Sequence, residues 1–207
     1  MIDHLIFDFD GTVSDSYPVF HRIIHNIAED HGLKIPVDEA ELDRLLKINT
    51  GMVYKTFGWE TCFSREEYGR EFRIWQDRFA YNFTAFPEAI ALLEHALQKG
   101  KKLYIYTHSG DVVHKIMKNM GINSMFSYVL TANRGFPAKP APDALQFLMK
   151  ECSLQPQACM MIGDRPIDAL AGMNAGMTGV LWDADNRYEN VLVDHRVSSL
   201  LDICQLI

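Results

Sequence analysis

The chain has little of what marks several common protein classes. It contains only four cysteines and no CxxC pair, which argues against a disulfide framework or a cysteine-rich zinc site. Lys and Arg total 20 against 27 Asp and Glu, a formal charge of -7, so broad attraction to nucleic acid or anionic lipid is excluded. No charged-then-apolar leader opens the chain, and no apolar run approaches the roughly 18 residues that span a bilayer. We therefore expect a cytoplasmic protein with no nucleic-acid or membrane partner.

What the chain does have is a regular alternation of strand and helix patterns. Its 207 residues are 48% hydrophobic, enough for one core and a modest inserted domain. Helical patterns at 87–100, 111–120, 142–151 and 166–175 alternate with short apolar runs rich in β-forming residues, and this alternation predicts a parallel sheet. The predicted strands are 4–9, 102–107, 128–132, 159–163 and 178–182, with a weak sixth strand at 193–197 before a last helix that ends at 207.

One interval breaks this alternation. Between Asp15 and about Phe86 only helical patterns occur, at 17–32, 37–48, 50–58 and 64–83. The sequence therefore predicts a core of residues 1–15 and 87–207, with an inserted helical bundle at 16–86 between two linkers. His21 and His25 lie four residues apart within the insert, but no third metal ligand is evident, so we interpret them as solvated or packing side chains.

Polar side chains follow the predicted strands, where parallel sheets bind ligands. The end of the first predicted strand carries Asp8, and Asp10, Gly11 and Thr12 come just after it. The second strand ends at Thr107, which His108 and Ser109 follow, the segment after the third strand carries Lys139, and the fourth strand is followed by Asp164 and Asp168. Acids crowded at one point need a cation between them, and an oxygen-rich site with open positions suits Mg²⁺. A surface pair on an edge strand is the alternative for Asp8 and Asp10, but the apolar neighbours Ile6, Phe7 and Phe9 favour a buried strand.

These residue types fit phosphoryl transfer. One carboxylate could attack phosphorus as a nucleophile, and another could protonate the leaving oxygen and then activate water. Lys139 and the Thr107 hydroxyl would hold the phosphoryl oxygens as charge develops.

Four segments also carry a family resemblance: DFDGT at 8–12, Thr107 at a strand end, KP at 139–140, and GDRPIDALAGMNAGM at 163–177. In this order they resemble the motifs of the haloacid dehalogenase-like hydrolase superfamily, and the interruption after the first motif is similar to the phosphoglycolate phosphatase and β-phosphoglucomutase branch with its helical cap. Two positions depart from that branch. His108 stands where many of its phosphatases have Asn, and Arg165 stands where Ser or Thr is frequent.

The resemblance implies a role for each motif residue. Asp8 would accept the phosphoryl group and Asp10 would act as acid and base. Mg²⁺ would be held by the Asp8 side chain, the Asp10 main-chain carbonyl and the Asp164 side chain, with Asp168 steadying these ligands. Catalysis would also use Thr107 and Lys139, and the substrate would lie against Gly11, Thr12, His108 and Ser109.

We therefore expect an α/β protein with a Rossmann-like parallel sheet core and an inserted all-helical cap domain. Its expected activity is Mg²⁺-dependent hydrolysis of a small phosphorylated metabolite through an aspartyl phosphate, by a monomer or weak dimer. The dehalogenases of the superfamily lack the second acid, so Asp10 argues for phosphate chemistry. A phosphomutase of the β-phosphoglucomutase type remains an alternative, as does a non-catalytic phospho-acceptor or binding protein.

Overall fold

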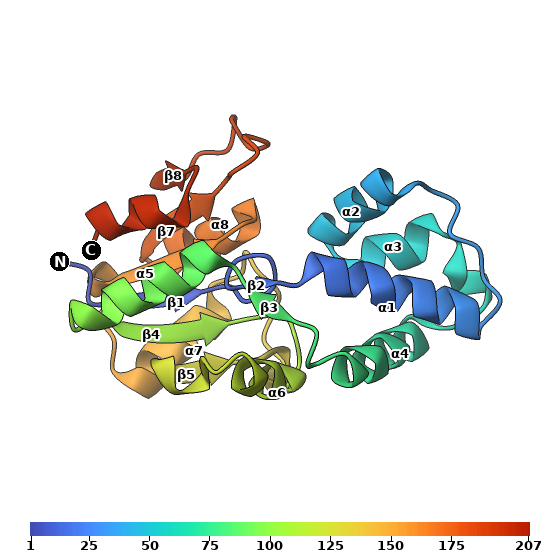
Figure 1. Ribbon diagram of the computed structural model, residues 1–207. Helices are drawn as coiled ribbons and strands as arrows, with labels where there is room; N and C mark the ends of the chain where they lie inside the picture. Colours follow the sequence, from blue (N-terminus) through green and yellow to red (C-terminus); the bar gives the residue numbers. More distant parts are fainter. The chain divides into compact units, whose positions relative to one another are not determined.

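A computed structural model describes residues 1–207 and divides them into two compact units (Figure 1). Unit 1 consists of Met1–Ser14 and Ala85–Ile207, and unit 2 of Asp15–Thr84. The sequence-based division places its boundaries one and two residues later, after residues 15 and 86. None of the helices combines the length and the apolar character that crossing a membrane requires.

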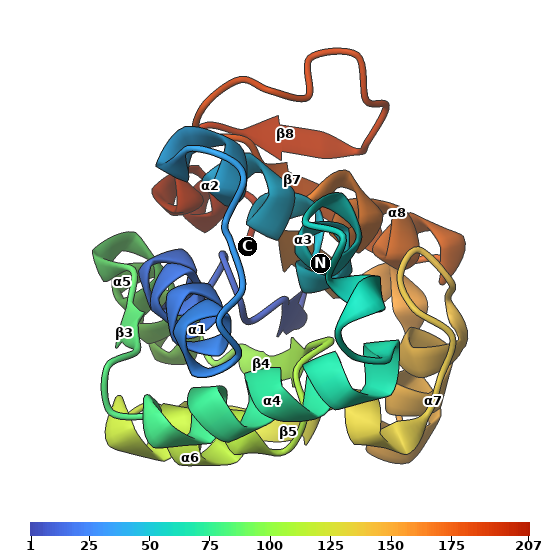
Figure 2. The ribbon, with the colours of Figure 1, turned by 90° about the vertical axis from the view of Figure 1, so that its right-hand side faces the viewer.

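Unit 1 is built on a six-stranded sheet in the order β5-β4-β1-β6-β7-β8. Every neighbouring pair is parallel, which confirms the predicted sheet, and β8 forms one of its edges (Figure 2). The strands are β1 (His4–Phe7), β4 (Lys102–Tyr106), β5 (Phe126–Leu130), β6 (Cys159–Gly163), β7 (Thr178–Trp182) and β8 (His195–Val197).

Helices bury the apolar side chains of the sheet. They are α5 (Pro87–Gln98), α6 (Val112–Asn119), α7 (Asp143–Cys152) and α8 (Pro166–Asn174). On one face, Ile6, Tyr104 and Met161 pack with Leu145 and Leu148 of α7 and with Ala171 of α8. Full burial of an aliphatic side chain of this size contributes roughly 1.5–3 kcal/mol, so this layer fixes the strands whose ends carry the polar motif residues.

The first strand is shorter than its sequence pattern. β1 ends at Phe7, whereas the apolar run predicted a strand to Phe9. The chain turns instead, because the amides of Val13 and Ser14 both donate to the Phe9 carbonyl, at 3.1 and 2.8 Å. Gly11 has a φ of +87° in this turn, a conformation that glycine adopts without steric penalty. Residues 8–14 therefore form a loop beyond the strand end.

Short 3₁₀ helices account for the other differences in unit 1. They are η2 (Asn123–Met125), η3 (Ala132–Arg134), η4 (Pro156–Ala158) and η5 (Leu200–Gln205). The predicted last helix is η5, which buries Leu200 and Ile203. Only two of its six residues are buried, so the apolar pattern of the sequence is too short to distinguish a 3₁₀ helix from an α-helix.

Unit 2 is helical, as the sequence predicts. It contains α1 (Tyr17–Asp30), α2 (Glu39–Ile48), α3 (Thr50–Thr56), η1 (Trp59–Thr61) and α4 (Arg65–Arg78), and Figure 2 shows α2 and α4 on either side of α1. Asp38 accepts the Glu41 amide at 2.8 Å to start α2, and Ser64 forms a capping box with Glu67 at the start of α4. These caps satisfy amides that a helix start leaves without partners.

Aromatic and aliphatic side chains form the core of unit 2. Trp59, Tyr68 and Phe72 are buried, and Tyr68 contacts Trp59 edge-on and Phe72 in a tilted arrangement. His21 and His25 each lie 2.9 Å from a carboxylate oxygen of Glu39, so both histidines pair with a single acid on the facing helix.

Two very short strands lie where the chain passes between the units. β2 (Ser14–Asp15) and β3 (Thr84–Ala85) form a two-stranded sheet. The sequence analysis found no strand here, because two residues are too few to show an alternating pattern.

Candidate active site at the carboxyl edge of the sheet

Three neighbouring strands of unit 1 end almost level. Phe7 of β1 pairs with Ile105 of β4 and with Ile162 of β6. The residues that directly follow these strands are Asp8, Thr107 and Asp164. Strand register therefore brings these three side chains to the same edge, although they are far apart in sequence.

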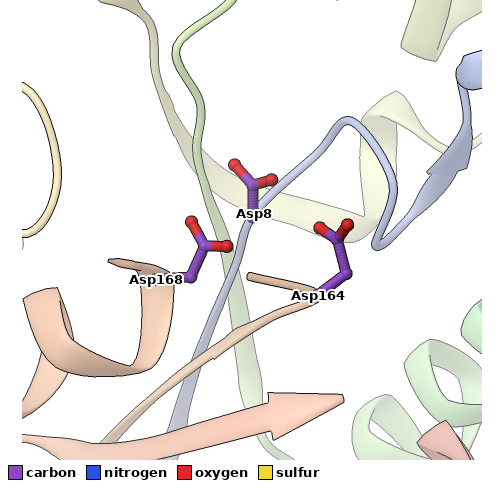
Figure 3. Close-up of side chains that lie close together, drawn as sticks. All are labelled: Asp8, Asp164 and Asp168. Atoms are coloured by element: carbon purple, nitrogen blue, oxygen red, sulfur yellow. The ribbon is translucent and has the colours of Figure 1, made fainter. Parts of the chain in front are cut away.

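Three carboxylates meet at this edge. Oxygen atoms of Asp8, Asp164 and Asp168 all lie within 4.8 Å of one another, and Figure 3 shows the three side chains gathered beyond the strand ends. Asp168 belongs to the first turn of α8, and both Asp8 and Asp168 are buried. Such a concentration of negative charge in the protein interior requires compensation.

Lys139 supplies part of that compensation. Its Nζ donates to Asp8 Oδ1 at 2.6 Å, to Asp168 Oδ1 at 2.8 Å and to the Tyr106 carbonyl at 2.9 Å. The ammonium group therefore uses its full set of three donors. Burial alone would lower the pKa of Lys139, but the charges of Asp168 and Asp8 outweigh that effect and raise it.

The two oxygens of Asp8 differ in their surroundings. Oδ1 is held by Lys139, whereas Oδ2 is buried and has no hydrogen-bond partner. Nη2 of Arg165 lies 3.8 Å from Oδ2, which is beyond hydrogen-bond distance. A buried carboxylate oxygen without a donor is rare in proteins, and it marks a position where a cation or a reacting group would be stabilised.

Asp168 and Asp164 are both fixed by hydrogen bonds. Asp168 accepts from Lys139 through Oδ1 and from the Arg165 amide through Oδ2, at 3.1 Å. The Thr12 hydroxyl donates to Asp164 Oδ1 at 3.1 Å and accepts the Asp164 amide at 2.9 Å. The structure thus places Thr12, a predicted substrate-binding residue, against a predicted metal ligand.

Asp10 lies in the turn after β1 and outside the carboxylate cluster. Its Oδ2 accepts from the Ser109 hydroxyl at 2.6 Å, and the Ser109 amide donates to Oγ1 of Thr107 at 2.9 Å. The loop after β4 therefore orients Asp10. Asp168 occupies the third place in the side-chain cluster, while the resemblance assigned to Asp10 only a main-chain ligand.

The loop that carries Lys139 has two further partners. The Lys139 amide donates to Nε2 of His108 at 3.1 Å, and Nδ2 of Asn174 donates to the Pro140 carbonyl at 2.9 Å. His108 was predicted to bind substrate, whereas Asn174 was not predicted to have any role at the site. Nothing in the sequence marks Asn174, because it reaches a carbonyl 34 positions away.

The first comparison with known proteins concerns the family. The family model described as "Haloacid dehalogenase-like hydrolase" matches residues 5–181. This range includes all four sequence motifs and the helical insert.

Individual proteins agree with this match. The chain is 26% identical to "Pyrophosphatase PpaX" of Oceanobacillus iheyensis, over 98% of this chain and 95% of that protein. It is 30% identical to "Hexitol phosphatase A" of Escherichia coli, over 83% of this chain and 78% of that protein. The crystal structure of a predicted phosphoglycolate phosphatase from Haemophilus somnus has the same fold, with a TM-score of 0.84, 20% identity, and coverage of 99% of this chain and 97% of that one.

The family match spans most of the chain, and the motif residues lie together at the carboxyl edge of a parallel sheet. The expected fold, a Rossmann-like core with an inserted helical domain, is confirmed. The chain belongs to the haloacid dehalogenase-like hydrolase family.

Proposed function

We propose that the protein is a Mg²⁺-dependent phosphatase that hydrolyses a small phosphorylated metabolite through an aspartyl phosphate on Asp8. The observation that carries the proposal is the asymmetry of Asp8, whose Oδ1 is bound by Lys139 while its buried Oδ2 has no hydrogen-bond partner. Nucleophilic carboxylates of this kind form phosphoenzyme intermediates. The phosphatase names of the relatives support the same reaction class.

The first half-reaction uses Asp8 and Asp10. A carboxylate oxygen of Asp8 forms a bond to phosphorus as the bond between phosphorus and the substrate's alcohol oxygen breaks, and Asp10 gives its proton to that departing oxygen. In the second half-reaction Asp10 takes a proton from water as the water oxygen bonds to phosphorus. The bond between phosphorus and the Asp8 oxygen breaks, which releases inorganic phosphate and restores the Asp8 carboxylate. The hydrogen bond from Ser109 to Asp10 holds this carboxylate in orientation for both steps.

Lys139 and Thr107 are assigned to charge stabilisation. Lys139 is buried and permanently directed at Asp8, so its charge offsets negative charge on the phosphoryl oxygens without reorganisation. Thr107 is buried at the strand end, where its Oγ1 already accepts the Ser109 amide. Its own hydroxyl proton is therefore directed to another acceptor, a role that a phosphoryl oxygen fills.

The donor set fits a hard divalent cation. It consists of carboxylate oxygens of Asp8, Asp164 and Asp168 within 4.8 Å of one another, and Asp8 also has a buried oxygen, Oδ2, that lacks a donor. Asp8, the Asp10 carbonyl and Asp164 would hold Mg²⁺, and Asp168 is tied to Lys139 and to the Arg165 amide. When bound, the ion would neutralise charge on the carboxylates and on the phosphoryl group.

Substrate selection is assigned to the inserted helical domain. We place this domain at residues 16–86 and the catalytic core at 1–15 and 87–207. The motif residues in unit 1 handle the phosphoryl group that all phosphate monoesters share, so discrimination among metabolites requires residues elsewhere in the chain.

Phosphate release from a panel of sugar phosphates, phosphoglycolate, nucleotides and other monoesters tests the function. Activity should vanish in excess EDTA and return with Mg²⁺, and undiminished turnover without divalent metal would contradict the metal assignment. The panel should include isomerisation of sugar phosphates with a bisphosphate primer, because transfer in preference to hydrolysis would identify a phosphomutase.

Asp8→Asn tests the nucleophile. The amide keeps the size of the side chain but is a poor nucleophile, so turnover should fall at least about 10³-fold. The matched control is Asp185→Asn, because Asp185 is exposed in the loop after β7, and this variant should retain wild-type turnover. Thermal unfolding should show that both variants fold. Substantial phosphate release by Asp8→Asn would exclude Asp8 as the nucleophile.

A further inference from the structure

The loop that carries Lys139 is exposed except at a few points. From Gly135 to Pro140 the chain has no helix or strand, and Gly135, Pro137, Ala138 and Pro140 are exposed. Lys139 is the buried residue among them, and its side chain has no exposed surface. Loops of this kind are more mobile than the elements that they connect, so the position of the ammonium group depends on what anchors the loop.

Two side chains anchor the backbone on either side of this point. Nε2 of His108, from the loop after β4, accepts the Lys139 amide at 3.1 Å. Nδ2 of Asn174, the last residue of α8, donates to the Pro140 carbonyl at 2.9 Å. His108 binds the N–H of Lys139, and Asn174 binds the C=O of the adjacent Pro140. Together the two hydrogen bonds restrict both displacement and rotation of the loop.

We propose that His108 and Asn174 are positioning residues that hold the Lys139–Pro140 backbone, and thereby keep Nζ of Lys139 between Asp8 and Asp168. The proposal rests on the proposed phosphatase function, because it concerns how Lys139 serves Asp8. It gives His108 a structural contact in place of the substrate contact that the resemblance implied.

The chemistry of His108 supports this assignment. Accepting an amide proton requires an unprotonated Nε2, so the neutral ring carries its proton on Nδ1. Loss of solvent around the ring, and then the charges of Lys139 and Arg165, lower the pKa of His108 to about 4, although Asp168 acts in the opposite direction. His108 is nevertheless an exposed residue at the surface, so the observation that decides its role is the hydrogen bond from the Lys139 amide, and near pH 7 the ring is a neutral acceptor.

Tyr106 links the two ends of Lys139. Its ring contacts the His108 ring edge-on, with centroids 6.1 Å apart. The same ring lies 4.5 Å from Nζ of Lys139, and the Tyr106 carbonyl accepts from Nζ. The segment Tyr106–His108 therefore contacts Lys139 at its ammonium group and at its backbone. A shift of the loop would change the position of Nζ relative to Asp8.

The test compares His108→Leu with His108→Gln. Leucine removes the acceptor, whereas the Gln carbonyl oxygen reaches about as far as Nε2 and can accept the same amide. A misplacement of about 1 Å can reduce a rate about 10²-fold, so His108→Leu should lower kcat by about 10- to 100-fold with little change in KM. His108→Gln should stay within about threefold of wild type. His114→Leu, on the exposed side of α6, is the matched control and should retain full activity.

Hydrogen exchange of the Lys139 amide provides a readout that does not need turnover. The amide should exchange at least about tenfold faster in His108→Leu than in the wild type and in His108→Gln. Asn174→Ala should also lower kcat and should accelerate exchange in the same loop. Thermal unfolding checks that each variant is folded.

The outcomes separate the two proposals. Unchanged exchange of the Lys139 amide in His108→Leu would overturn the anchoring role, and so would faster exchange with an unchanged kcat. A wild-type protein that releases no phosphate from any monoester would refute the proposed function, while the exchange comparison would still decide whether His108 anchors the loop.

Discussion

Removal of the Lys139 ammonium group should strongly destabilise unit 1. Nζ bridges Asp8 and Asp168, at 2.6 and 2.8 Å, and neither the lysine nor Asp168 has exposed side-chain surface. The substitution Lys139→Met keeps most of the apolar length of the side chain and deletes the charge. It therefore leaves two buried carboxylates without their common cation, while the loss of packing is small.

The expected magnitude follows from this burial. Breaking a buried ion pair by removing one partner costs about 3–5 kcal/mol, because the remaining charge stays in the interior. A typical domain is stable by only about 5–15 kcal/mol, so the free energy of unfolding should fall by about a fifth or more. Bound Mg²⁺ would stabilise the native state by mass action and reduce the loss, so the measurement belongs in EDTA.

Urea unfolding of four proteins measures the effect: wild type, Lys139→Met, Asp168→Asn and the double variant. Each single variant should lose about 3–5 kcal/mol, and the double variant should lose at least about 1 kcal/mol less than their sum, since contacting residues are not additive. Lys118→Met, at an exposed position on α6, should change stability by less than about 0.5 kcal/mol. A loss below about 1 kcal/mol in Lys139→Met, or strict additivity, would refute the bridging role.

Two further predictions concern Thr12 and His108. Thr12→Val removes both hydrogen bonds that orient Asp164, so Mg²⁺ affinity measured by titration calorimetry should fall about 10- to 100-fold, whereas wild-type affinity would show that Asp164 needs no such support. The native pKa of His108 is about 4, below its ordinary value of 6.5, so between these pH values the unfolded chain binds more protons and stability falls as the pH falls. The melting temperature of the wild type should therefore fall more between pH 7 and pH 5 than the melting temperature of His108→Gln. Equal decreases in the two proteins would contradict this prediction.

Much of the fold could be predicted because its signals are local. The alternation of β-rich runs and helical patterns predicted the sheet, and the rule that ligands bind at the carboxyl ends of parallel strands brought Asp8, Thr107 and Asp164 together. The structure places all three directly after β1, β4 and β6. The end of β1 was wrong by two residues, because Phe9 is buried in the following turn and extends the apolar run without extending the strand.

The contacts that orient the site could not be predicted in the same way. Thr12 reaches Asp164 across 152 positions, and Lys139 reaches His108 across 31. Each contact depends on the path of a loop between elements, which periodicity does not describe. The resemblance grouped Thr12 and His108 with the substrate-binding residues, and it gave no indication of their hydrogen bonds to Asp164 and to the Lys139 amide.

Formal charge explains why this site needs all of its cations. Four carboxylates, those of Asp8, Asp10, Asp164 and Asp168, lie at the edge with two cationic side chains, Lys139 and Arg165. His108 adds no charge near pH 7, because its pKa is lowered to about 4. With all four acids ionised, two negative charges remain, so the protein alone would repel a phosphate dianion. One divalent cation would balance these charges, and the proton that Asp10 carries as general acid would leave the Mg²⁺-loaded site with a net positive charge. A protonated His108 would add a positive charge beside Lys139 and break the hydrogen bond that holds the loop. A neutral His108 therefore serves both the charge balance and the position of Lys139, and its lowered pKa keeps the ring neutral well below pH 7.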